Sequence, residues 1–228
     1  EGLLGAAEYF LTCSNIPTGG EIHSFCMCPG GVIIPAVHSE GELNTNGMSF
    51  SLRNHKYGNA GLVATFEPAE YGSDAGPLSG VRFQQYWEQL AYKTGGGDFV
   101  CPAQPADDFV YERSKSRELE GSYPRGRRYT DLATILPEKL VKGLRHALPV
   151  FDRSMPGFAS GFGTLHAVET RCSSPVRITR NPETRESLNV KGLYPAGEGA
   201  GYAGGIVSAA LDGIHSAAAI IGRFAPVV

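Results

Sequence analysis

Residues 197–205 read Gly-Glu-Gly-Ala-Gly-Tyr-Ala-Gly-Gly and contain the spacing G-x-G-x-x-G at Gly199, Gly201 and Gly204. The apolar segment 190–196 before them predicts a strand, and the small-residue pattern of 206–220 after them predicts a helix. A strand, a glycine turn and a helix N-terminus together suit the phosphate or polar edge of a nucleotide cofactor. The alternative interpretation is a tight strand-to-helix turn without a ligand.

The position of this motif limits what it can build. A dinucleotide-binding βαβ unit needs a second strand and an acidic residue about 20 residues further on. Only 23 residues follow Gly205, and their pattern predicts helix and tail. We therefore expect the glycines to close a cofactor site whose main nucleotide-binding half lies elsewhere. Glycine permits a close approach of the backbone, and Glu198 is placed to accept hydrogen bonds from ribose or ribityl hydroxyls.

Composition excludes several other classes of protein. The chain has 228 residues, 42% of them apolar, and a net charge of −3, which gives no footprint for nucleic acid. No apolar run approaches the roughly 18 residues of a membrane helix, so we expect no membrane partner. Five cysteines without framework spacing favour a reducing, cytoplasmic location. The chain begins at Glu1 rather than Met, from which we expect a fragment or a processed product.

The order of predicted elements favours an α+β fold. Strands are expected at 7–13, 22–25, 32–37 and 62–66, and a helix at 78–93 that ends at three glycines. Pro137 fits the first turn of a second helix. Residues 101–130 are rich in proline, glycine and charge, and predict a long loop or linker. Further strands are expected at 165–172, 176–179 and 190–196.

Four segments carry a resemblance to a known family. The glycine motif with its flanks, 193–206, resembles the C-terminal flavin-contacting segment of predicted FAD-dependent dehydrogenases of the glutathione-reductase-like type. Residues 24–31 (Ser-Phe-Cys-Met-Cys-Pro-Gly-Gly), 46–49 (Asn-Gly-Met-Ser) and 168–178 resemble further motifs of that family. The matches run from about residue 7 to residue 220. One departure is Cys172, where the family pattern leads us to expect a small hydroxyl residue.

The resemblance implies a specific role for this chain. Family members carry an N-terminal βαβ unit that binds the ADP part of FAD, and this chain lacks it. Residues 1–13 would belong to or return from the flavin lobe, 14–160 would form a substrate-side or cap region, and 161–228 would be the C-terminal flavin-binding segment. The helix N-terminus would stabilise negative charge on reduced flavin. The implied cofactor-contacting residues are Gly197, Glu198, Gly199, Ala200, Gly201, Tyr202, Ala203, Gly204, Gly205 and Ile206.

The expected function is therefore that of the C-terminal portion of an FAD-dependent oxidoreductase. The intact protein would exchange a hydride or electrons between FAD and an unidentified small organic molecule. Its partners would be that substrate and the N-terminal FAD-binding half of the same protein. The isolated chain is expected to be colourless and inactive. The alternative from another class is a non-catalytic binding or scaffold module with a flavoprotein-like fold.

Two other constellations offer candidate catalytic groups. Cys26 and Cys28 are interpreted as buried structural thiols, as redox-active thiols near a flavin, or as a metal site completed by His23 or His38. Alternation along a strand would place Glu169 and Arg171 on one face. Arg171 could there bind a substrate carboxylate or the flavin's carbonyl edge, or support the sheet through an ion pair. Beyond the weak candidates Cys26, Cys28 and Arg171, the sequence assigns no catalytic residue and no metal.

Overall fold

The computed structural model describes residues 9–72 and 76–225, and it confirms the expected mixed α+β fold. The chain packs as two compact units. The first comprises residues 1–67 and 84–170, and the second comprises 68–83 and 171–228. Helix α1 (Ser79–Gly95) contributes residues to both units and agrees with the helix expected at 78–93. The expected division of the chain at residues 13 and 160, into flavin-binding and substrate-side parts, stays a prediction.

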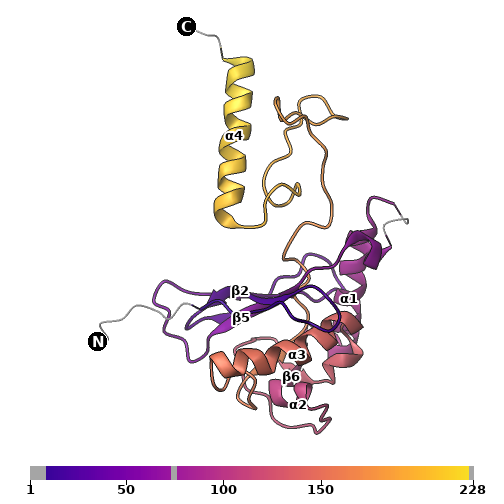
Figure 1. The fold of residues 1–228 in the computed structure, drawn as a ribbon, viewed down its shortest axis with the longest axis vertical. Helices are drawn as coiled ribbons and strands as arrows, with labels where there is room; N and C mark the ends of the chain where they lie inside the picture. Colours follow the sequence, from indigo (N-terminus) through magenta and orange to yellow (C-terminus); the bar gives the residue numbers. More distant parts are fainter. Residues whose placement is uncertain (1–8, 73–75, 226–228) are drawn as a thin grey trace. The chain divides into compact units, whose positions relative to one another are not determined.

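The first unit is built on an antiparallel sheet in the order β1-β2-β5. Its strands are β1 (Thr12–Cys13), β2 (Ile22–Cys28) and β5 (Asn59–Ala64). Helix α3 (Glu138–Ser154) covers one face of this sheet (Figure 1). On that face, Ile22 is buried and Leu62 packs against the core. Because side chains alternate along a strand, Asn59 and Gly61 belong to the opposite, outer face.

Two smaller sheets complete this unit. Strands β3 (Val32–Pro35) and β4 (Thr45–Met48) pair antiparallel. The third sheet has the order β7-β6-β8, with β6 (Cys101–Pro105) between β7 (Arg127–Tyr129) and β8 (Thr164–His166). The short helices are η1 (Pro68–Tyr71) in the second unit, and α2 (Ala106–Val110) and η3 (Leu132–Thr134) in the first.

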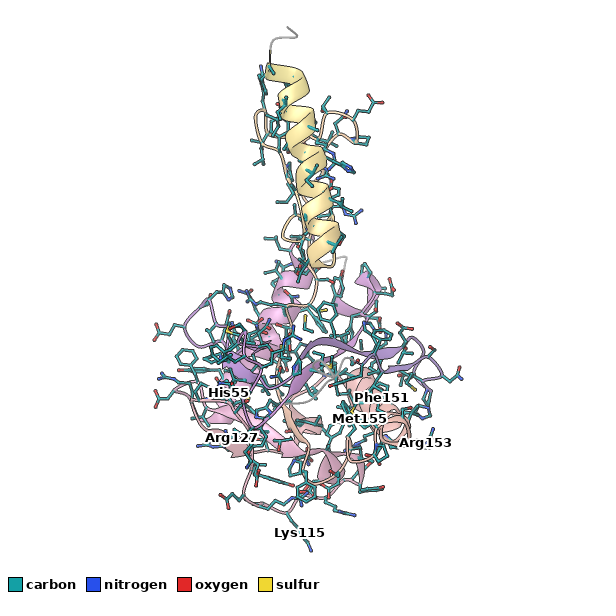
Figure 2. The ribbon with its side chains drawn as sticks, turned by 90° about the vertical axis from the view of Figure 1, so that its left-hand side faces the viewer. His55, Lys115, Arg127, Phe151, Arg153 and Met155 are labelled. Atoms are coloured by element: carbon teal, nitrogen blue, oxygen red, sulfur yellow. The ribbon has the colours of Figure 1, made fainter. Side chains whose placement is uncertain are left out.

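The expected long loop at 101–130 is wrong, because its first residues form the central strand β6. A strand with two prolines is unusual since proline has no amide hydrogen to donate. Here the carbonyl of Pro102 accepts from the Ala167 amide at 3.0 Å, and the Cys101 amide donates to the Gly126 carbonyl at 3.0 Å. Pro102 therefore serves the sheet as an acceptor only. The exposed residues of the segment are 111–118, 120, 124–126 and 128, and Lys115 among them projects outward in Figure 2.

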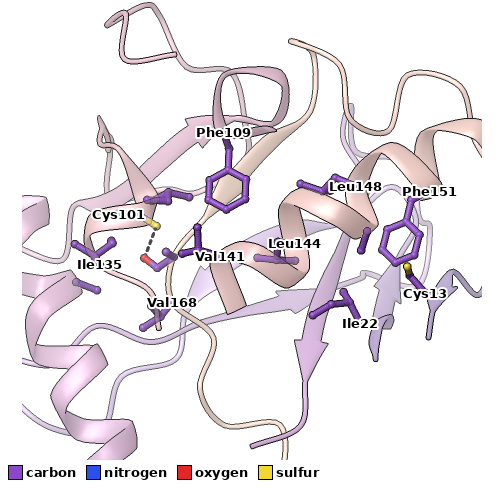
Figure 3. Close-up of a cluster of buried hydrophobic side chains, with 14 of the residues drawn as sticks. Cys13, Ile22, Cys101, Phe109, Ile135, Val141, Leu144, Leu148, Phe151 and Val168 are labelled. Atoms are coloured by element: carbon purple, nitrogen blue, oxygen red, sulfur yellow. Dashed lines mark hydrogen bonds between the residues drawn. The ribbon is translucent and has the colours of Figure 1, made fainter. Parts of the chain in front are cut away.

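The core of the first unit joins α2 and α3 to the sheets (Figure 3). Phe109, Leu148 and Phe151 are almost wholly buried. The Cys101 thiol donates to the Ala167 carbonyl at 3.5 Å, and burial raises the pKa of this thiol to about 12. Cys101 is therefore an inert packing residue rather than a reactive group.

The second unit contains mostly irregular chain and one long helix, α4 (Ile206–Phe224). The helix confirms the expectation for 206–220. The strands expected at 176–179 and 190–196 are wrong, because neither segment forms a strand; an isolated bridge between Arg180 and Ser187 lies in the chain between them. A strand needs a neighbour for its backbone hydrogen bonds, and no described segment runs beside 190–196 as a ladder.

Candidate functional site

The glycine turn, residues 197–205, is two consecutive backbone turns. The Gly201 amide donates to the Glu198 carbonyl at 2.8 Å, and the Tyr202 amide donates to the Gly197 carbonyl at 3.0 Å. Gly197 and Gly201 have φ values of +72° and +82°, a region that favours glycine. A Cβ on Gly201 would lie 2.5 Å from the Val176 carbonyl oxygen. The fold itself therefore requires glycine at position 201.

The other two glycines of the G-x-G-x-x-G spacing have open space in front of them. No described atom would lie within 4 Å of a Cβ on Gly199 or on Gly204. Neither residue has a positive φ. The described residues thus give no steric reason for glycine at positions 199 and 204, so any such reason lies in a bound molecule or in further protein.

Asp212 of α4 holds the turn to the helix. Its carboxylate accepts two hydrogen bonds from Arg180, at 2.6 and 2.9 Å, one from Arg185 at 2.7 Å and one from the Gly197 amide at 2.8 Å. The Asp212 side chain is only 10% exposed and that of Arg180 only 6%. The hydrogen bond from Arg180 holds the pKa of Asp212 well below its usual range, although burial opposes this. Asp212 therefore fixes where the glycine turn begins.

Several of the predicted cofactor-contacting residues instead face the segment 174–180. Ala200 is buried, and its carbonyl accepts from the Ile178 amide at 3.1 Å. The Tyr202 hydroxyl donates to the Ile178 carbonyl at 3.1 Å, and its ring lies against the guanidinium of Arg180 at 3.6 Å. The turn thus presents its backbone and Glu198 outward, while Ala200 and Tyr202 anchor it. The predicted contacts of these residues with a flavin stay predictions.

The outward side of the turn offers free hydrogen-bonding groups. The Glu198 side chain is exposed and has no hydrogen-bond partner among the described residues. Gly205 caps α4, with its amide bonded to the Ser208 hydroxyl at 3.2 Å. Within the described chain no acceptor reaches the amides of Ile206 and Val207. Such amides carry a partial positive charge and favour an anionic or electron-rich ligand.

Helix α4 carries apolar side chains that no other described residue covers. Ile206 is 91% exposed and Val207 is 72% exposed. A stripe of large apolar side chains continues along the helix as Leu211, Ile214 and Ile221. The polar side of the helix is the side that contacts the rest of its unit, through Asp212, Ser216 and Arg223. An exposed apolar stripe of this length is typical of an interaction surface.

The family-like motifs 24–31 and 46–49 meet in the first unit. A Cβ on Gly30 would lie 1.9 Å from the Arg53 carbonyl oxygen, and one on Gly31 would lie 2.3 Å from the Met48 carbonyl oxygen. A Cβ on Gly47 would lie 2.1 Å from Oδ1 of Asn59. Glycine at these three positions lets neighbouring backbone segments and the Asn59 side chain approach closely. The fold therefore explains the glycines of both motifs without any ligand.

Cys26 and Cys28 lie where β2 is irregular. The pairing of β2 with β5 shifts register between Phe25 and Cys28, and Cys26 has a φ of +46°. The Cys28 thiol donates to the Cys26 carbonyl at 3.4 Å. The pKa of the Cys28 thiol is raised overall, chiefly by burial. A hydrogen bond with Ser49 opposes this increase, and the charge of Glu169 adds to it. A raised pKa disfavours the thiolate, so the redox interpretation gains no support here.

The metal interpretation of the cysteines gains no support either. Among the described residues, the group of three side chains close enough to share an ion is His38, Glu42 and Glu88, whose ligand atoms lie within 4.8 Å of one another. Cys26 and Cys28 are not in that group, and His38 is. All five cysteines of the chain are described and free. Arg171 begins the second unit, and its predicted catalytic role stays a prediction.

Glu169 lies over the outer face of the first sheet. Its Oε2 would be 3.4 Å from a Cβ on Gly61 of β5. The segment that carries it is held to β4, since the Thr45 amide donates to the Val168 carbonyl at 2.8 Å. Burial raises the pKa of Glu169 to about 6, and within the described chain no hydrogen bond or ion pair reaches its carboxylate. From the sequence, Glu169 was expected only to share a strand face with Arg171.

Glu169→Gln is expected to stabilise the protein at high pH but not at low pH. Because the folded-state pKa of this acid is raised from 4.5 to about 6, the folded state binds the proton more tightly than the unfolded state. Stability is therefore greatest below pH 4.5 and falls as the pH rises through 6. The neutral glutamine avoids this loss, which corresponds to at most about 2 kcal/mol above pH 7.

Urea unfolding of both proteins at pH 4.5 and pH 8 measures this difference. Glu138→Gln serves as the control, because Glu138 is exposed and its pKa is lowered by Lys142. An equal effect of Glu169→Gln at both pH values would contradict the raised pKa.

A glycine-rich turn that opens a helix, with free amides and open space before it, is an arrangement that can accept an anionic or electron-rich group. The chain belongs to the family described as FAD-dependent protein, C-terminal domain-like, which matches residues 1–172. The matched range ends before the glycine turn. No described helix is both long and apolar enough to cross a membrane.

One curated relative spans nearly the whole chain. It is a protein of Clostridium beijerinckii named only as uncharacterized, 44% identical over 223 residues. The alignment covers 97% of this chain and 42% of the relative. The chain thus spans less than half the length of the curated relative that it matches.

Proposed function

We propose that this chain is the C-terminal part of an FAD-dependent oxidoreductase of the glutathione-reductase-like type. The observation that carries the proposal is the open space before Gly199 and Gly204, next to the unpaired amides that open α4. Membership of an FAD-dependent family supports it. FAD, when bound, would supply two-electron exchange with an organic substrate.

The residues present fit the polar rim of a flavin and its ribityl chain. The amides of Ile206 and Val207 would donate to electron-rich oxygens of the cofactor, and the Glu198 carboxylate would accept from its hydroxyls. Gly199 and Gly204 would leave room for a flat ring. Asp212 and Gly201 would hold the turn in its shape, so that the binding groups are fixed before the ligand arrives.

The partner that completes the site would be the N-terminal half of the same protein. The exposed apolar stripe of α4, with Val207, Leu211 and Ile214, supports this proposal, since such a surface is stabilised by burial. The length of the curated relative, of which the chain covers 42%, supports it as well. The five free cysteines favour a cytoplasmic location for the protein.

The flavin absorption spectrum tests this proposal. The full-length protein that contains this chain is expected to be yellow, with one FAD per chain after purification, and the 228-residue chain alone is expected to be colourless. A full-length protein that takes up no flavin, even when refolded with added FAD, would favour the scaffold alternative. A yellow 228-residue chain would show that this part binds FAD by itself.

A further inference from the structure

Helix α4 exposes one continuous apolar face, which we call the α4 face. At 3.6 residues per turn, its side chains cover about 140° of the helix circumference. Every residue on this face is exposed, and none of them carries a charge. The α4 face consists of Ile206, Val207, Ala210, Leu211, Ile214, Ala217, Ala218 and Ile221.

The polar side of α4 points toward its own unit instead. Asp212 accepts hydrogen bonds from Arg180 and Arg185, and Arg185 also donates to the Ser216 hydroxyl at 3.3 Å. Figure 1 shows the irregular chain of the unit on one side of the helix. A surface helix of a globular protein normally buries its apolar side and exposes its polar side. Helix α4 does the reverse, which indicates that further protein covers the α4 face.

The second unit has almost no apolar core of its own. Among its described residues, the buried apolar side chains are the small ones of Pro195 and Ala200. The first unit, by contrast, buries the large side chains of Phe109, Leu148 and Phe151. Burial of apolar surface is the main favourable contribution to folding. We therefore expect the second unit to need apolar burial that a partner supplies.

The absence of charge on the α4 face limits the kind of partner. Interfaces that form and separate are about as polar as the rest of a protein surface, whereas permanent interfaces are more apolar. Helices that lie on membranes carry lysine and arginine on their polar side. In α4 the single residue of these two types is Arg223, which pairs with Glu186. The α4 face therefore suits a permanent contact with protein.

The length of the curated relative indicates where this partner comes from. Its alignment covers 97% of this chain but 42% of the relative, so more than half of the relative lies outside the aligned part. The family is described as C-terminal domain-like, which favours a preceding part of the same polypeptide. A partner within the same polypeptide is present once for every α4 face and at a high effective concentration.

We propose that the α4 face docks permanently on the N-terminal half of the intact protein, and that this contact, rather than FAD, completes the core of the second unit. The inference rests on the proposed function for the identity of the partner. The α4 face extends for about 22 Å at 1.5 Å per residue, whereas the proposed cofactor site reaches only the first turn of the helix. Because Asp212 ties the Gly197 amide to α4 at 2.8 Å, docking also fixes the glycine turn before a ligand binds.

The first test measures the accessibility of two neighbouring positions on α4. Ile214 lies in the middle of the α4 face, and His215, which is also exposed, lies about 100° further around the helix. Ile214→Cys and His215→Cys are each made in the 228-residue chain and in the full-length protein, and the latter is prepared with and without FAD. Maleimide labelling is followed by mass spectrometry of the α4 peptide, since the chain has five cysteines of its own.

The labelling rates are expected to differ in one place. From the 228-residue chain to the full-length protein, the thiol introduced by Ile214→Cys is expected to react about 100-fold more slowly, because it reacts only when the interface opens. The thiol introduced by His215→Cys is expected to slow much less. Both results are expected with and without FAD.

A second pair of variants tests whether the contact holds the second unit together. Ile214→Lys places a charge in the proposed interface, and His215→Lys places the same charge beside it. In the FAD-free full-length protein, Ile214→Lys is expected to raise hydrogen exchange of the α4 amides about 100-fold, because a buried unpaired charge is costly. His215→Lys should leave the exchange nearly unchanged. Equal exchange in the two variants would overturn the role of the contact in completing the core.

The outcomes separate this inference from the proposed function. A slowing at position 214 no larger than that at 215 overturns the docking. Slow labelling at 214 in the 228-residue chain alone also overturns it, because the first unit or a second copy would then be the cover. Protection that appears only with FAD overturns the independence from the cofactor. Protection at 214 in a full-length protein that binds no flavin supports the docking and removes the proposed function.

Discussion

Replacing Gly204 with valine is expected to lower the FAD affinity of the full-length protein about 100-fold, which corresponds to about 2.7 kcal/mol. Nothing in the described chain lies within 4 Å of a Cβ at this position, so the substitution leaves the turn itself undisturbed. Valine would instead fill the space that we assign to the cofactor. Equilibrium titration with FAD, followed by flavin fluorescence, measures the loss.

Two other glycines provide the controls for this experiment. Gly213→Ala in α4 also meets open space, but it lies two turns further along the helix and is expected to leave FAD affinity unchanged. Gly201→Val is expected to lower FAD content by a different route, because its Cβ would lie 2.5 Å from the Val176 carbonyl oxygen and the turn itself would be displaced. Unchanged FAD affinity in Gly204→Val would remove the basis of the proposed function.

Asp212→Asn is expected to destabilise the second unit by about 3 kcal/mol, the lower end of the range for breaking a buried ion pair. Asparagine cannot neutralise Arg180 and Arg185, whose guanidinium groups donate to Asp212 at 2.6 and 2.7 Å. The Gly197 amide would keep an acceptor, but a weaker one. Hydrogen exchange of α4 amides measures the change, because local opening of the unit exposes them.

The effect of Asp212→Asn is expected to depend on pH. The folded-state pKa of Asp212 is depressed, so its stabilising contribution is complete above the unfolded-state value of about 3.9 and is lost as the pH falls below it. Wild-type and variant should therefore converge in strong acid. Glu186→Gln, which breaks the more exposed pair with Arg223, is the matched control and should have a small effect. Equal protection of α4 in both variants would contradict the role of Asp212.

The sequence predicted the three long helices well, but it predicted the strands only in part and missed the short helix α2. The spacing of apolar residues predicted α1 and α3, and the glycines after α1 and Pro137 before α3 marked two of their ends. Strand β6 was missed because its two prolines are typical of loops, and only the neighbouring segment shows that the Pro102 carbonyl accepts a hydrogen bond in the sheet. Strand β4 was missed because Thr-Asn-Gly-Met has no apolar alternation. The segment 190–196 has the composition of a strand, but no described strand pairs with it.

The candidate site was likewise predicted only in part from the sequence. The glycine motif was visible as a spacing, but the spacing could not tell Gly201, which the fold requires, from Gly204, which it does not. In the sequence, Asp212 is a charged residue within an otherwise apolar helix. That isolated charge is the signal that could have indicated its buried ion pair with Arg180. In the first unit, Glu169 lies more than 100 positions from Gly61 in the sequence, so only the fold brings its carboxylate over that glycine.

The difference between the three motif glycines has a consequence for natural variation. Under the proposed function, a descendant that lost the cofactor but kept the fold would still need Gly201, since the Val176 carbonyl leaves no room for a side chain there. It would be free to accumulate larger residues at positions 199 and 204. Reading these three positions across genomes would therefore separate lineages that retain a ligand from those that have lost it, before any protein is purified.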